Sequence, residues 1–500
     1  MHIRPWWPVG VFLFGLFTVV AALGVSGRDA TSTPNSGTSA ALANGVTISS
    51  RCDQSESAEH VAFSSSTSHK FLGYGVNVQI GKAEENIPRT ITDVKKLGFV
   101  WVRIHLGLDD SGPNSETGSS GGESRADAPS ANDGAGVQRR FQEFFSAAHA
   151  AGIKIVNWGE GRGTAAFFES TAQRNGKSGS HVRSRSIASL AQYIAEDLHS
   201  LAHAGIRPDL MEPFNEPNLK KHKFEPADYA ELIKDIEENF KNDSSDLHLA
   251  APGTASNLSQ GVDFVRAMQA QGSLSGLKAI TVHTYYVRDR PTNFGIPSAN
   301  DPALQTLLQT AKGLGVPLIS TEFGGTDLKT KDTDPDRESV DPAEEFKAAL
   351  DLIEAGESAA LVWELYPNFN GGALLKSWAL IDNNGPTNAY WPFILTRRIP
   401  VGADVLNIER TDISPTMTSL GYAAFRDGRT LYVGLSNPAS SQVTVALDLS
   451  RMGSFTVVHA ASFLPTRTTE QNTAVHSSTC PLTVTVPSGT GAMFDINEAQ

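Results

Sequence analysis

Short apolar runs alternate with amphipathic stretches throughout residues 71–398. Each run is six to nine residues long, and several lack a clean alternation of polar and apolar side chains. That pattern is typical of parallel strands that are buried on both faces. Eight such runs span residues 73–80, 99–106, 153–158, 208–215, 247–252, 277–285, 316–323 and 359–365.

The stretches between the runs have the spacing of helices that bury one face. Phe141, Phe144 and Phe145 form an apolar stripe, and residues 190–201 repeat the pattern. Alternating strands and helices imply parallel β–α–β units, and eight of them predict an α/β fold, a (β/α)8 TIM barrel over residues 70–398. An open, doubly wound sheet is the alternative. Six helices are expected to end at a glycine, which favours the left-handed turn after a helix: Gly98, Gly152, Gly205, Gly272, Gly315 and Gly356.

The pattern changes after residue 398. Val443, Val445 and Leu447 alternate with other residues, and Asp427-Gly428 is a hairpin signal. Several short strands separated by turn residues predict a smaller β-sandwich domain over residues 399–500.

The N-terminal region is read in three parts. Residues 1–27 contain Arg4 and then a charge-free apolar stretch, which indicates a signal peptide; an uncleaved membrane anchor is the alternative. Either one predicts a secreted or periplasmic location. Residues 28–45 are rich in small and polar residues and are expected to form a flexible linker. Residues 46–66 carry weak strand signals and could join the sandwich.

The chain contains two cysteines, Cys52 and Cys480. In an exported protein an even number of cysteines suggests one disulfide, here joining the segment near Cys52 to the sandwich. Two unpaired thiols are the alternative. Two cysteines so far apart do not make a zinc site of the usual kind, and we expect no metal.

One long polar insertion follows the second predicted strand. Residues 109–136 are rich in Ser, Gly, Asp and Asn. A mobile loop beside the site and a disordered insertion without a role are both compatible with that composition.

Composition narrows the choice of partner. A chain of 500 residues is too long for one compact core, which indicates more than one domain. Of these residues 40% are hydrophobic, and the net charge is −13. Because the chain has no long basic run, we expect no nucleic-acid partner. Contact with a membrane is expected only through the N-terminal segment. We expect a monomer that acts on a neutral or cationic substrate.

Two carboxylates stand where a barrel places its chemistry. Catalytic groups in this fold lie at the carboxyl ends of the strands, and Glu216 ends the fourth run while Glu322 ends the seventh. These ends lie on opposite sides of the mouth. Glycoside hydrolysis needs a protonated carboxyl for the leaving oxygen and an ionised one to attack the anomeric carbon. Separations of about 5–5.5 Å give retention of configuration, and wider ones give inversion. Glu212, deeper on the same strand, is expected to be a buried, hydrogen-bonded barrel residue.

The residues around Glu216 resemble a known family. Met-Glu-Pro-Phe-Asn-Glu-Pro-Asn at 211–218 is similar to the acid/base strand of the clan A glycoside hydrolases, which include the family 5 endoglucanases and mannanases and the family 39 xylosidases. The resemblance implies that Asn215 binds the sugar 2-hydroxyl and that Glu216 is the acid/base. It also implies that Glu322, in Thr-Glu-Phe-Gly, is the nucleophile.

Further strand ends match the clan pattern. By the resemblance, Arg103 holds the nucleophile ionised, which an adjacent guanidinium does well. His283 and Tyr285 contact the nucleophile and substrate, and Trp363 is the aromatic platform beneath the sugar.

The third strand departs from family 5, which often carries a histidine pair there. Here it ends in Asn157-Trp158-Gly159-Glu160, and Asn157, Trp158 and Glu160 are candidates for substrate binding. The family assignment within the clan therefore stays open between families 5 and 39.

These residues predict a retaining hydrolase of β-linked oligosaccharides or polysaccharides that needs no cofactor. No Gly-x-Ser-x-Gly elbow or nucleotide-binding glycine fingerprint directly follows a predicted strand, and no His-Glu-x-x-His motif is present to support another chemistry. A transglycosylase with the same residues and a non-catalytic carbohydrate-binding protein are the alternatives. Sugar and linkage depend on loops whose shapes the sequence does not reveal.

Overall fold

A computed structural model provides the structure of this chain. It describes residues 39–42, 45–50, 58–78, 86–105, 134–159, 168–174, 177–182, 186–219, 223–240, 247–255, 257–287, 300–326, 341–366, 379–382, 385–410, 420–450, 454–464, 466–477 and 481–498.

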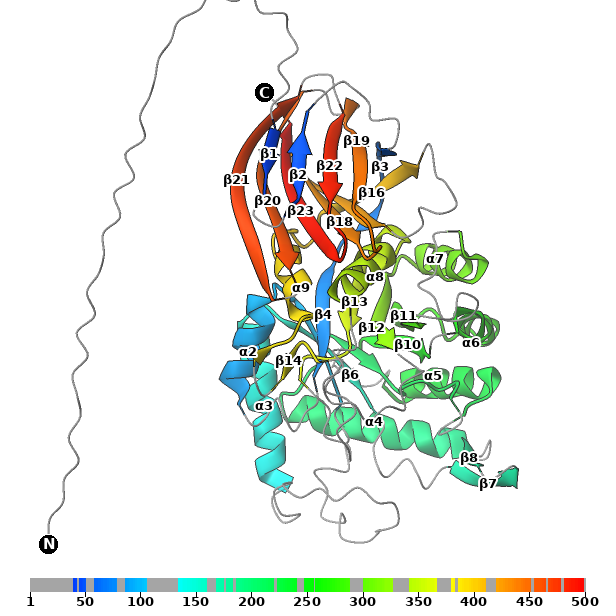
Figure 1. The fold of residues 1–500 in the computed structure, drawn as a ribbon. Helices are drawn as coiled ribbons and strands as arrows, with labels where there is room; N and C mark the ends of the chain where they lie inside the picture. The colour runs from blue at the N-terminus through cyan, green and yellow to red at the C-terminus, as the bar shows by residue number, and fades with distance from the viewer. Residues whose placement is uncertain are drawn as a thin grey trace, which may run out of the picture. The chain divides into compact units, whose positions relative to one another are not determined.

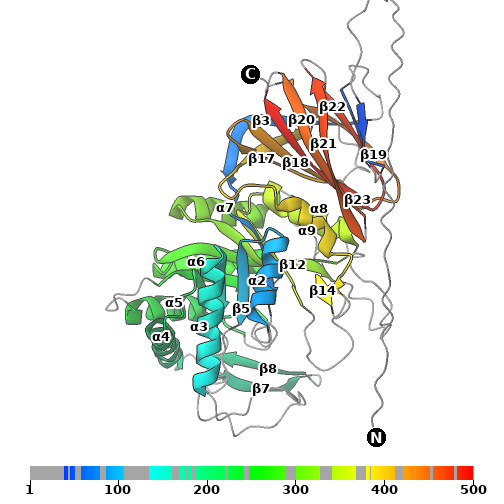
Figure 2. The same ribbon diagram turned by 90° about the vertical axis from the view of Figure 1, so that its left-hand side faces the viewer.

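Eight parallel strands close into a barrel (Figures 1 and 2). The last strand pairs with the first through Ala359 and Gly73, which confirms the predicted TIM barrel and excludes an open sheet. In sequence order the strands are β4 (Gly73–Val78), β5 (Trp101–His105), β6 (Lys154–Trp158), β9 (Leu210–Glu212), β10 (Leu249–Thr254), β11 (Leu277–Val287), β12 (Leu318–Thr326) and β13 (Ala359–Val362).

Helices surround the barrel, and their ends follow from local sequence. Asp301 and Asp341 each accept hydrogen bonds from the first turn of the following helix, which begins with a proline. Gly272 and Gly315 end two helices in the left-handed conformation, as predicted. The helices are α2 (Ile87–Lys96), α3 (Gly134–Ala150), α4 (Ile187–His203), α5 (Pro226–Phe240), α6 (Leu258–Gln271), α7 (Pro302–Leu314), α8 (Pro342–Glu354) and α9 (Tyr390–Thr396).

The interior of the barrel changes from apolar to polar along the strands. A cluster that includes Trp101, Leu210 and Ile319 fills the level at which the strands begin. Successive side chains of a strand point to opposite faces, so Arg103 and Glu212, two residues further on, also point inward. Both are fully buried. The apolar level thus supports a charged level above it.

The second domain is an 11-stranded, mostly antiparallel sheet that forms the predicted β-sandwich. It has its own core, which includes Phe63, Leu435 and Phe494. Three strands come from the N-terminal side: β1 (Ser39–Ala41), β2 (Thr47–Ser49) and β3 (Glu59–Lys70). The others are β16 (Asp404–Arg410), β17 (Gly421–Asp427), β18 (Thr430–Asn437), β19 (Val443–Asp448), β20 (Phe455–Leu464), β21 (Arg467–Ser477), β22 (Leu482–Val486) and β23 (Thr490–Glu498).

Two small hairpins complete the elements of the described residues. They are β7 (Phe168–Arg174) with β8 (Lys177–Val182), and β14 (Ile381–Asp382) with β15 (Gly385–Pro386).

Two sequence expectations need correction. The linker expected through residue 45 contains β1, in which Ala40 pairs with Ile48 of β2. Leu42 and Val46 are buried beside this hairpin, so strand pairing and apolar burial outweigh the flexible local composition. The long insertion expected over residues 109–136 ends earlier, because α3 begins at Gly134.

Several expectations fall outside the described residues. Cys52, Cys480, the segment 1–27 and residues 106–133 are among them. Within the described ranges, no helix is both long enough and apolar enough to cross a membrane.

Candidate active site

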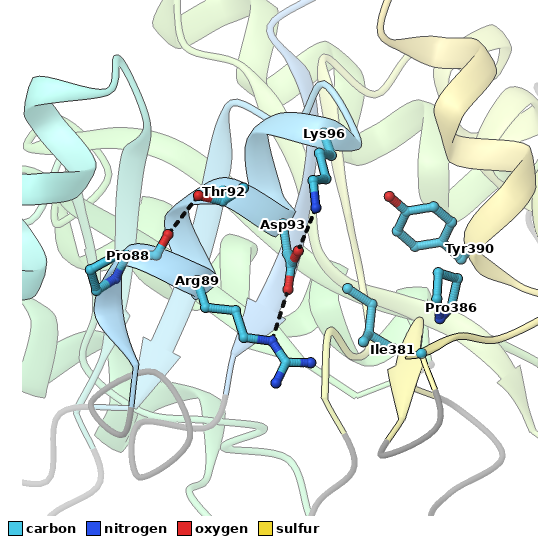
Figure 3. A pocket seen from close by; sticks show the side chains of 9 residues that line it. Pro88, Arg89, Thr92, Asp93, Lys96, Ile381, Pro386 and Tyr390 are labelled. Carbon is cyan, nitrogen blue, oxygen red and sulfur yellow. Dashed lines mark hydrogen bonds and ion pairs between the residues drawn. The ribbon is translucent and has the colours of Figure 1, made fainter. Parts of the chain in front are cut away.

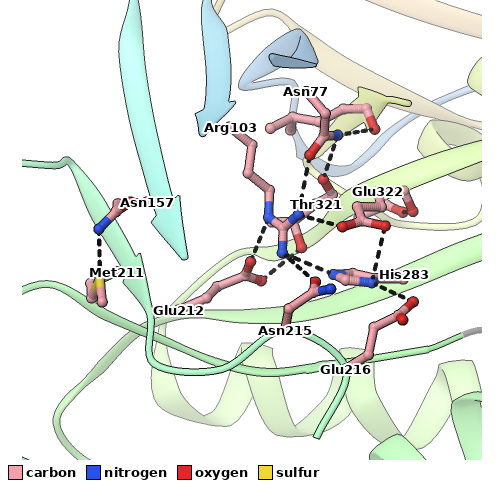
Figure 4. A network of polar contacts seen from close by, with 12 residues as sticks. Asn77, Arg103, Asn157, Met211, Glu212, Asn215, Glu216, His283, Thr321 and Glu322 are labelled. Carbon is pink, nitrogen blue, oxygen red and sulfur yellow. Dashed lines mark hydrogen bonds and ion pairs between the residues drawn. The ribbon is translucent and has the colours of Figure 1, made fainter. Parts of the chain in front are cut away.

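The two predicted catalytic carboxylates meet in the mouth of the barrel (Figure 4). Glu216 follows β9, and Glu322 lies on β12. One oxygen of each carboxylate and one ring nitrogen of His283 all lie within 4.8 Å of one another. The two carboxylates are therefore close enough to face a single sugar ring.

The backbone after β9 aims Glu216 at this point. Glu216 has a φ of +49°, in the left-handed region that residues other than glycine rarely adopt. Its N–H donates to the Gly253 carbonyl at 3.1 Å. The Asn218 side chain is tied to both backbone polar groups of Ala255, at 2.8 and 3.2 Å. The turn is thus anchored to the end of β10, which is the kind of over-determined geometry found at functional sites.

Glu322 is enclosed by hydrogen-bond donors. Arg103 Nη1 donates to Oε1, and the Tyr285 hydroxyl donates to Oε2. The side chain of Glu322 is 5% exposed, whereas that of Glu216 is 18% exposed. The buried, hydrogen-bonded carboxylate suits a nucleophile. The more accessible carboxylate, Glu216, suits an acid/base that must exchange protons with both a leaving group and a water molecule.

Arg103 is the centre of the polar network. Its Nη1 donates to Asn77 Oδ1 at 3.1 Å, and its Nη2 donates to Asn215 Oδ1 at 2.9 Å. Its Nε donates to Glu212 Oε2 at 2.7 Å. A planar guanidinium with all three nitrogens engaged can adopt one orientation only.

His283 links the two catalytic carboxylates. Its Nδ1 lies 3.1 Å from Glu216 Oε1 and 3.4 Å from Glu322 Oε2. Burial lowers the pKa of His283, but the Glu322 charge and the hydrogen bond to Glu216 outweigh that effect and raise it. A proton on Nδ1 therefore lies close to both carboxylates.

Its surroundings favour the protonated form of Tyr285. Burial raises its pKa well above the ordinary value, and the Glu322 charge raises it further. The hydroxyl is therefore a permanent donor to Glu322.

Glu216, His283 and Glu322 could also offer three ligand atoms to a metal ion. The Arg103 guanidinium already donates to Glu322 in the same cluster, however. The raised pKa of His283 further favours an imidazolium, which is not a ligand. The charges present thus disfavour an additional cation.

The two predicted aromatic residues lie at the ends of β6 and β13. The Trp158 ring centroid lies 5.3 Å from Arg103 Cζ, a cation–π contact, and the ring is partly exposed. Trp363 follows β13 and is also partly exposed, and its backbone N–H donates to the Phe323 carbonyl at 2.9 Å. Both residues are therefore partly accessible to solvent.

Asn157 does not join this cluster. It is fully buried, and its Nδ2 lies 3.3 Å from Met211 Sδ, apart from the arginine network (Figure 4). Alternation along β6 explains the difference, because Trp158 faces the barrel axis and Asn157 points to the opposite face. The geometry therefore gives no support to substrate binding by Asn157. Glu160, the other candidate on this segment, lies outside the described residues.

The sequence reasoning missed two members of the network. Asn77 on β4 donates to the Thr321 carbonyl at 3.0 Å and accepts from Arg103. Thr321 donates through Oγ1 to Glu212 at 2.7 Å. A polar Asn within the first apolar run was a usable signal for Asn77. For Thr321 there was none, because its orientation depends on strand register.

A separate hollow of about 450 Å³ lies between α2 and the β14–β15 hairpin (Figure 3). Its walls include Arg89, Asp93, Lys96 and Tyr390. Asp93 lies 3.5 Å from Arg89 Nε and 3.5 Å from Lys96 Nζ, so one carboxylate partly offsets two cations. None of the predicted site residues lines this hollow.

The closed parallel barrel and its β-sandwich are the fold of the clan A glycoside hydrolases. No family model and no curated protein matched the sequence. Among solved structures, a family 30 endoxylanase from Clostridium papyrosolvens C71 has a TM-score of 0.58 at 14% identity, covering 89% of this chain and 100% of that one.

Two further structures are similar. A family 39 enzyme from Xanthomonas axonopodis pv. citri has a TM-score of 0.54 at 12% identity, covering 89% of this chain and 98% of its own. An endo-β-1,6-glucanase has a TM-score of 0.56 at 13% identity, covering 89% and 94%. At such identities the likeness establishes the fold, and the reaction is argued from the site.

Proposed function

We propose that this protein is a retaining glycoside hydrolase that cleaves β-linked saccharides by double displacement. The observation that carries the proposal is the approach of the Glu216 and Glu322 carboxylates to within 4.8 Å, with a histidine between them. Retaining enzymes hold their two carboxyl groups about 5–5.5 Å apart, whereas inverting enzymes hold them about 6.5–9.5 Å apart to admit a water.

In the first step Glu322 attacks the anomeric carbon. The bond to the leaving oxygen breaks as Glu216 transfers its proton to that oxygen, and a covalent glycosyl-enzyme forms. In the second step Glu216 takes a proton from water, the hydroxide oxygen bonds to the anomeric carbon, and Glu322 is released. Arg103 and Tyr285 hold Glu322 in place, and both donate to it.

The remaining site residues have supporting roles in the proposal. His283 orients Glu216, Asn215 lies beside the arginine where a sugar hydroxyl could reach it, and Trp158 and Trp363 offer faces for sugar stacking. The reaction as written needs no metal and no cofactor.

The substrate class is a β-linked polysaccharide or oligosaccharide. Similar structures include an endoxylanase and an endo-β-1,6-glucanase, so β-xylan and β-glucan come first in a screen. We also propose an exported, monomeric protein with a Cys52–Cys480 disulfide.

Replacing each carboxylate tests the proposal. Glu216→Gln and Glu322→Gln should keep the fold and lower kcat/KM about 10³-fold or more, because each removes a group that acts on reacting atoms. Glu225→Gln is the matched control, since Glu225 directly precedes α5, is 59% exposed and forms an ion pair with Lys223 at the surface. Wild-type turnover of a saccharide substrate, whose leaving group needs an acid, would contradict the role assigned to either residue.

Stereochemistry provides a second test. The first product released, observed by NMR, should retain the anomeric configuration. With azide, Glu322→Gly should give a glycosyl azide of inverted configuration, and Glu216→Ala one of retained configuration. If the first product of the wild-type enzyme has the inverted configuration, the reaction is a single displacement and the proposed double displacement is wrong. Transfer of the sugar to a second sugar in place of water would indicate a transglycosylase.

A further inference from the structure

Glu212 is a third carboxylate in the barrel that takes no part in the proposed reaction. It lies on β9, four residues before Glu216, and is fully buried. Both of its oxygens are engaged. Oε2 accepts from Arg103 Nε at 2.7 Å, and Oε1 accepts from the Thr321 hydroxyl at 2.7 Å.

These two contacts lead to Glu322 by separate routes. In the first route, Glu212 accepts from Nε of Arg103 and so fixes its planar guanidinium group. Nη1 of the same group donates to the Glu322 carboxylate. Through Thr321, Glu212 holds the residue that precedes Glu322 on β12. One side chain therefore restrains both the donor to Glu322 and the backbone that carries it.

A bulge in β12 makes the second route possible. Val282 and His283 of β11 pair with Ser320 and Glu322, so Thr321 is an extra residue in the ladder. Such a bulge turns consecutive side chains toward the same side. Thr321 and Glu322 can thus both face the barrel axis, one towards Glu212 and one towards the mouth.

The site around Glu212 leaves it little freedom. A Cβ at Gly253, which has a φ of +61°, would lie 3.1 Å from Glu212 Oε1. Burial raises the pKa of Glu212, but the charges of Arg103 and His283 and the hydrogen bond from Thr321 outweigh that effect and lower it. Glu212 therefore remains a fixed anion beside Arg103.

We propose that Glu212 is a positioning residue that sets Glu322 for attack on the anomeric carbon, acting through Arg103 and Thr321. This inference rests on the proposed function and deepens it. Because the two Glu212 oxygens are held by Arg103 and Thr321, and Glu216 is the residue that serves the leaving group, the loss of Glu212 should slow glycosylation equally for good and poor leaving groups.

Glu212→Gln tests the inference, since it keeps the shape of the side chain and removes the charge. Kinetics with 2,4-dinitrophenyl and phenyl β-glycosides of the sugar that the wild-type enzyme releases should show a loss of about 10²-fold in kcat/KM for both. Glu216→Gln should instead recover most of its activity with the dinitrophenyl substrate, which needs no acid. The acid limb of the Glu212→Gln pH profile should also move to higher pH, because an Arg103 that is no longer held by Glu212 stabilises the ionised form of Glu322 less.

Asp495→Asn is the matched control. Asp495 is 4% exposed and accepts from Arg398 Nε at 2.8 Å, but it lies on β23 in the sandwich. This variant should lose stability and keep both the pH profile and the leaving-group dependence of the wild-type enzyme.

Several outcomes would overturn the inference. A folded Glu212→Gln with wild-type kinetics and pH profile would do so, as would a loss confined to the phenyl substrate. If Glu212→Gln does not fold, Thr321→Val carries the test: it should show a smaller loss of the same pattern, with Thr321→Ser restoring activity, and wild-type kinetics would refute the role.

Failure of the proposed function has a different signature, because the wild-type protein would then hydrolyse no glycoside. The positioning role is still testable in that case. A crystal structure of Glu212→Gln should show Arg103 displaced from Glu322, and an unchanged Arg103–Glu322 contact would refute the inference whether or not the chain is a hydrolase.

Discussion

Buried and partly buried titratable residues in this chain differ in how well their charges are compensated. Arg103 is surrounded by acceptors, and although burial lowers its pKa, Glu212 and Glu322 raise it overall. His69 on β3 instead faces a neutral acceptor. Its Nε2 lies 2.9 Å from the Glu357 carbonyl, and burial lowers its pKa to about 4 despite that hydrogen bond. The first arrangement favours the charged form and the second favours the neutral form.

His69 should make stability depend on pH. The unfolded chain protonates this histidine near pH 6.5, and the folded chain does so only near pH 4. Between these values the unfolded state binds more protons, so stability falls as pH falls through the window and the loss levels off below about 4. The loss from pH 7 to pH 4.5 should be about 2 kcal/mol.

Urea unfolding of wild-type protein and His69→Gln at several pH values measures this effect. Glutamine can still donate to the Glu357 carbonyl but does not titrate. The two stability curves should converge as pH falls from 7 to 4.5. Parallel curves over that range would show that His69 is not the group responsible.

At the scale of secondary-structure elements, the glycines that follow helices differ in how much space surrounds them. Gly98 after α2 and Gly152 after α3 both have left-handed backbones, with φ of +73° and +75°. A Cβ at Gly98 would lie 2.3 Å from Arg397 Cβ, just after α9, whereas a Cβ at Gly152 would meet nothing within 4 Å. Glycine is thus required by conformation at one position and by conformation and packing at the other.

The two alanine substitutions separate these requirements. Gly152→Ala should cost about 1–2 kcal/mol, the penalty of a left-handed backbone with a Cβ. Gly98→Ala should cost about 3 kcal/mol or more, because α2 must also move away from α9. Chemical denaturation of both variants checks the difference, and equal losses would mean that the α2–α9 contact readily relaxes.

In the molecule as a whole, the barrel and the sandwich share packing. Phe346 on α8 and Phe463 on β20 are both fully buried, with ring centroids 5.7 Å apart. Ser436 on β18 donates to the Ala343 carbonyl at 2.6 Å. At Gly421 on β17 a Cβ would lie 2.7 Å from Lys347 Cα, so α8 lies directly against the sheet. One hydrophobic core thus extends from the barrel into the sandwich.

Shared packing predicts shared unfolding. Phe346→Ala should cost about 3–5 kcal/mol, because it leaves a cavity where the two domains meet. Heat denaturation followed by circular dichroism and by residual activity should give one coincident transition, shifted to lower temperature, while kcat at 25 °C stays unchanged. Separate transitions for the two probes would mean that the domains unfold independently.

The local pattern of the chain is sufficient to predict the barrel and its two central carboxylates. Strand and helix periodicity act over a few residues, and parallel strands bring their carboxyl ends to one edge. For that reason Glu216 and Glu322 could be paired without a structure, although 106 positions separate them. The hydrogen bond between Arg103 and Glu212 was only partly predictable from the sequence. Glu212 was expected to be buried and hydrogen-bonded, but Arg103 was not identified as its donor.

Other features were decided by tertiary structure. Whether Asn157 or Trp158 faces the mouth depends on which residue of β6 points inward, and the orientation of Thr321 depends on one extra residue in β12. The placement of β1, β2 and β3 in the sandwich depends on pairing with strands hundreds of residues away. Local sequence specifies which residues can form a strand, but register and partner are set by the free energy of packing the whole chain.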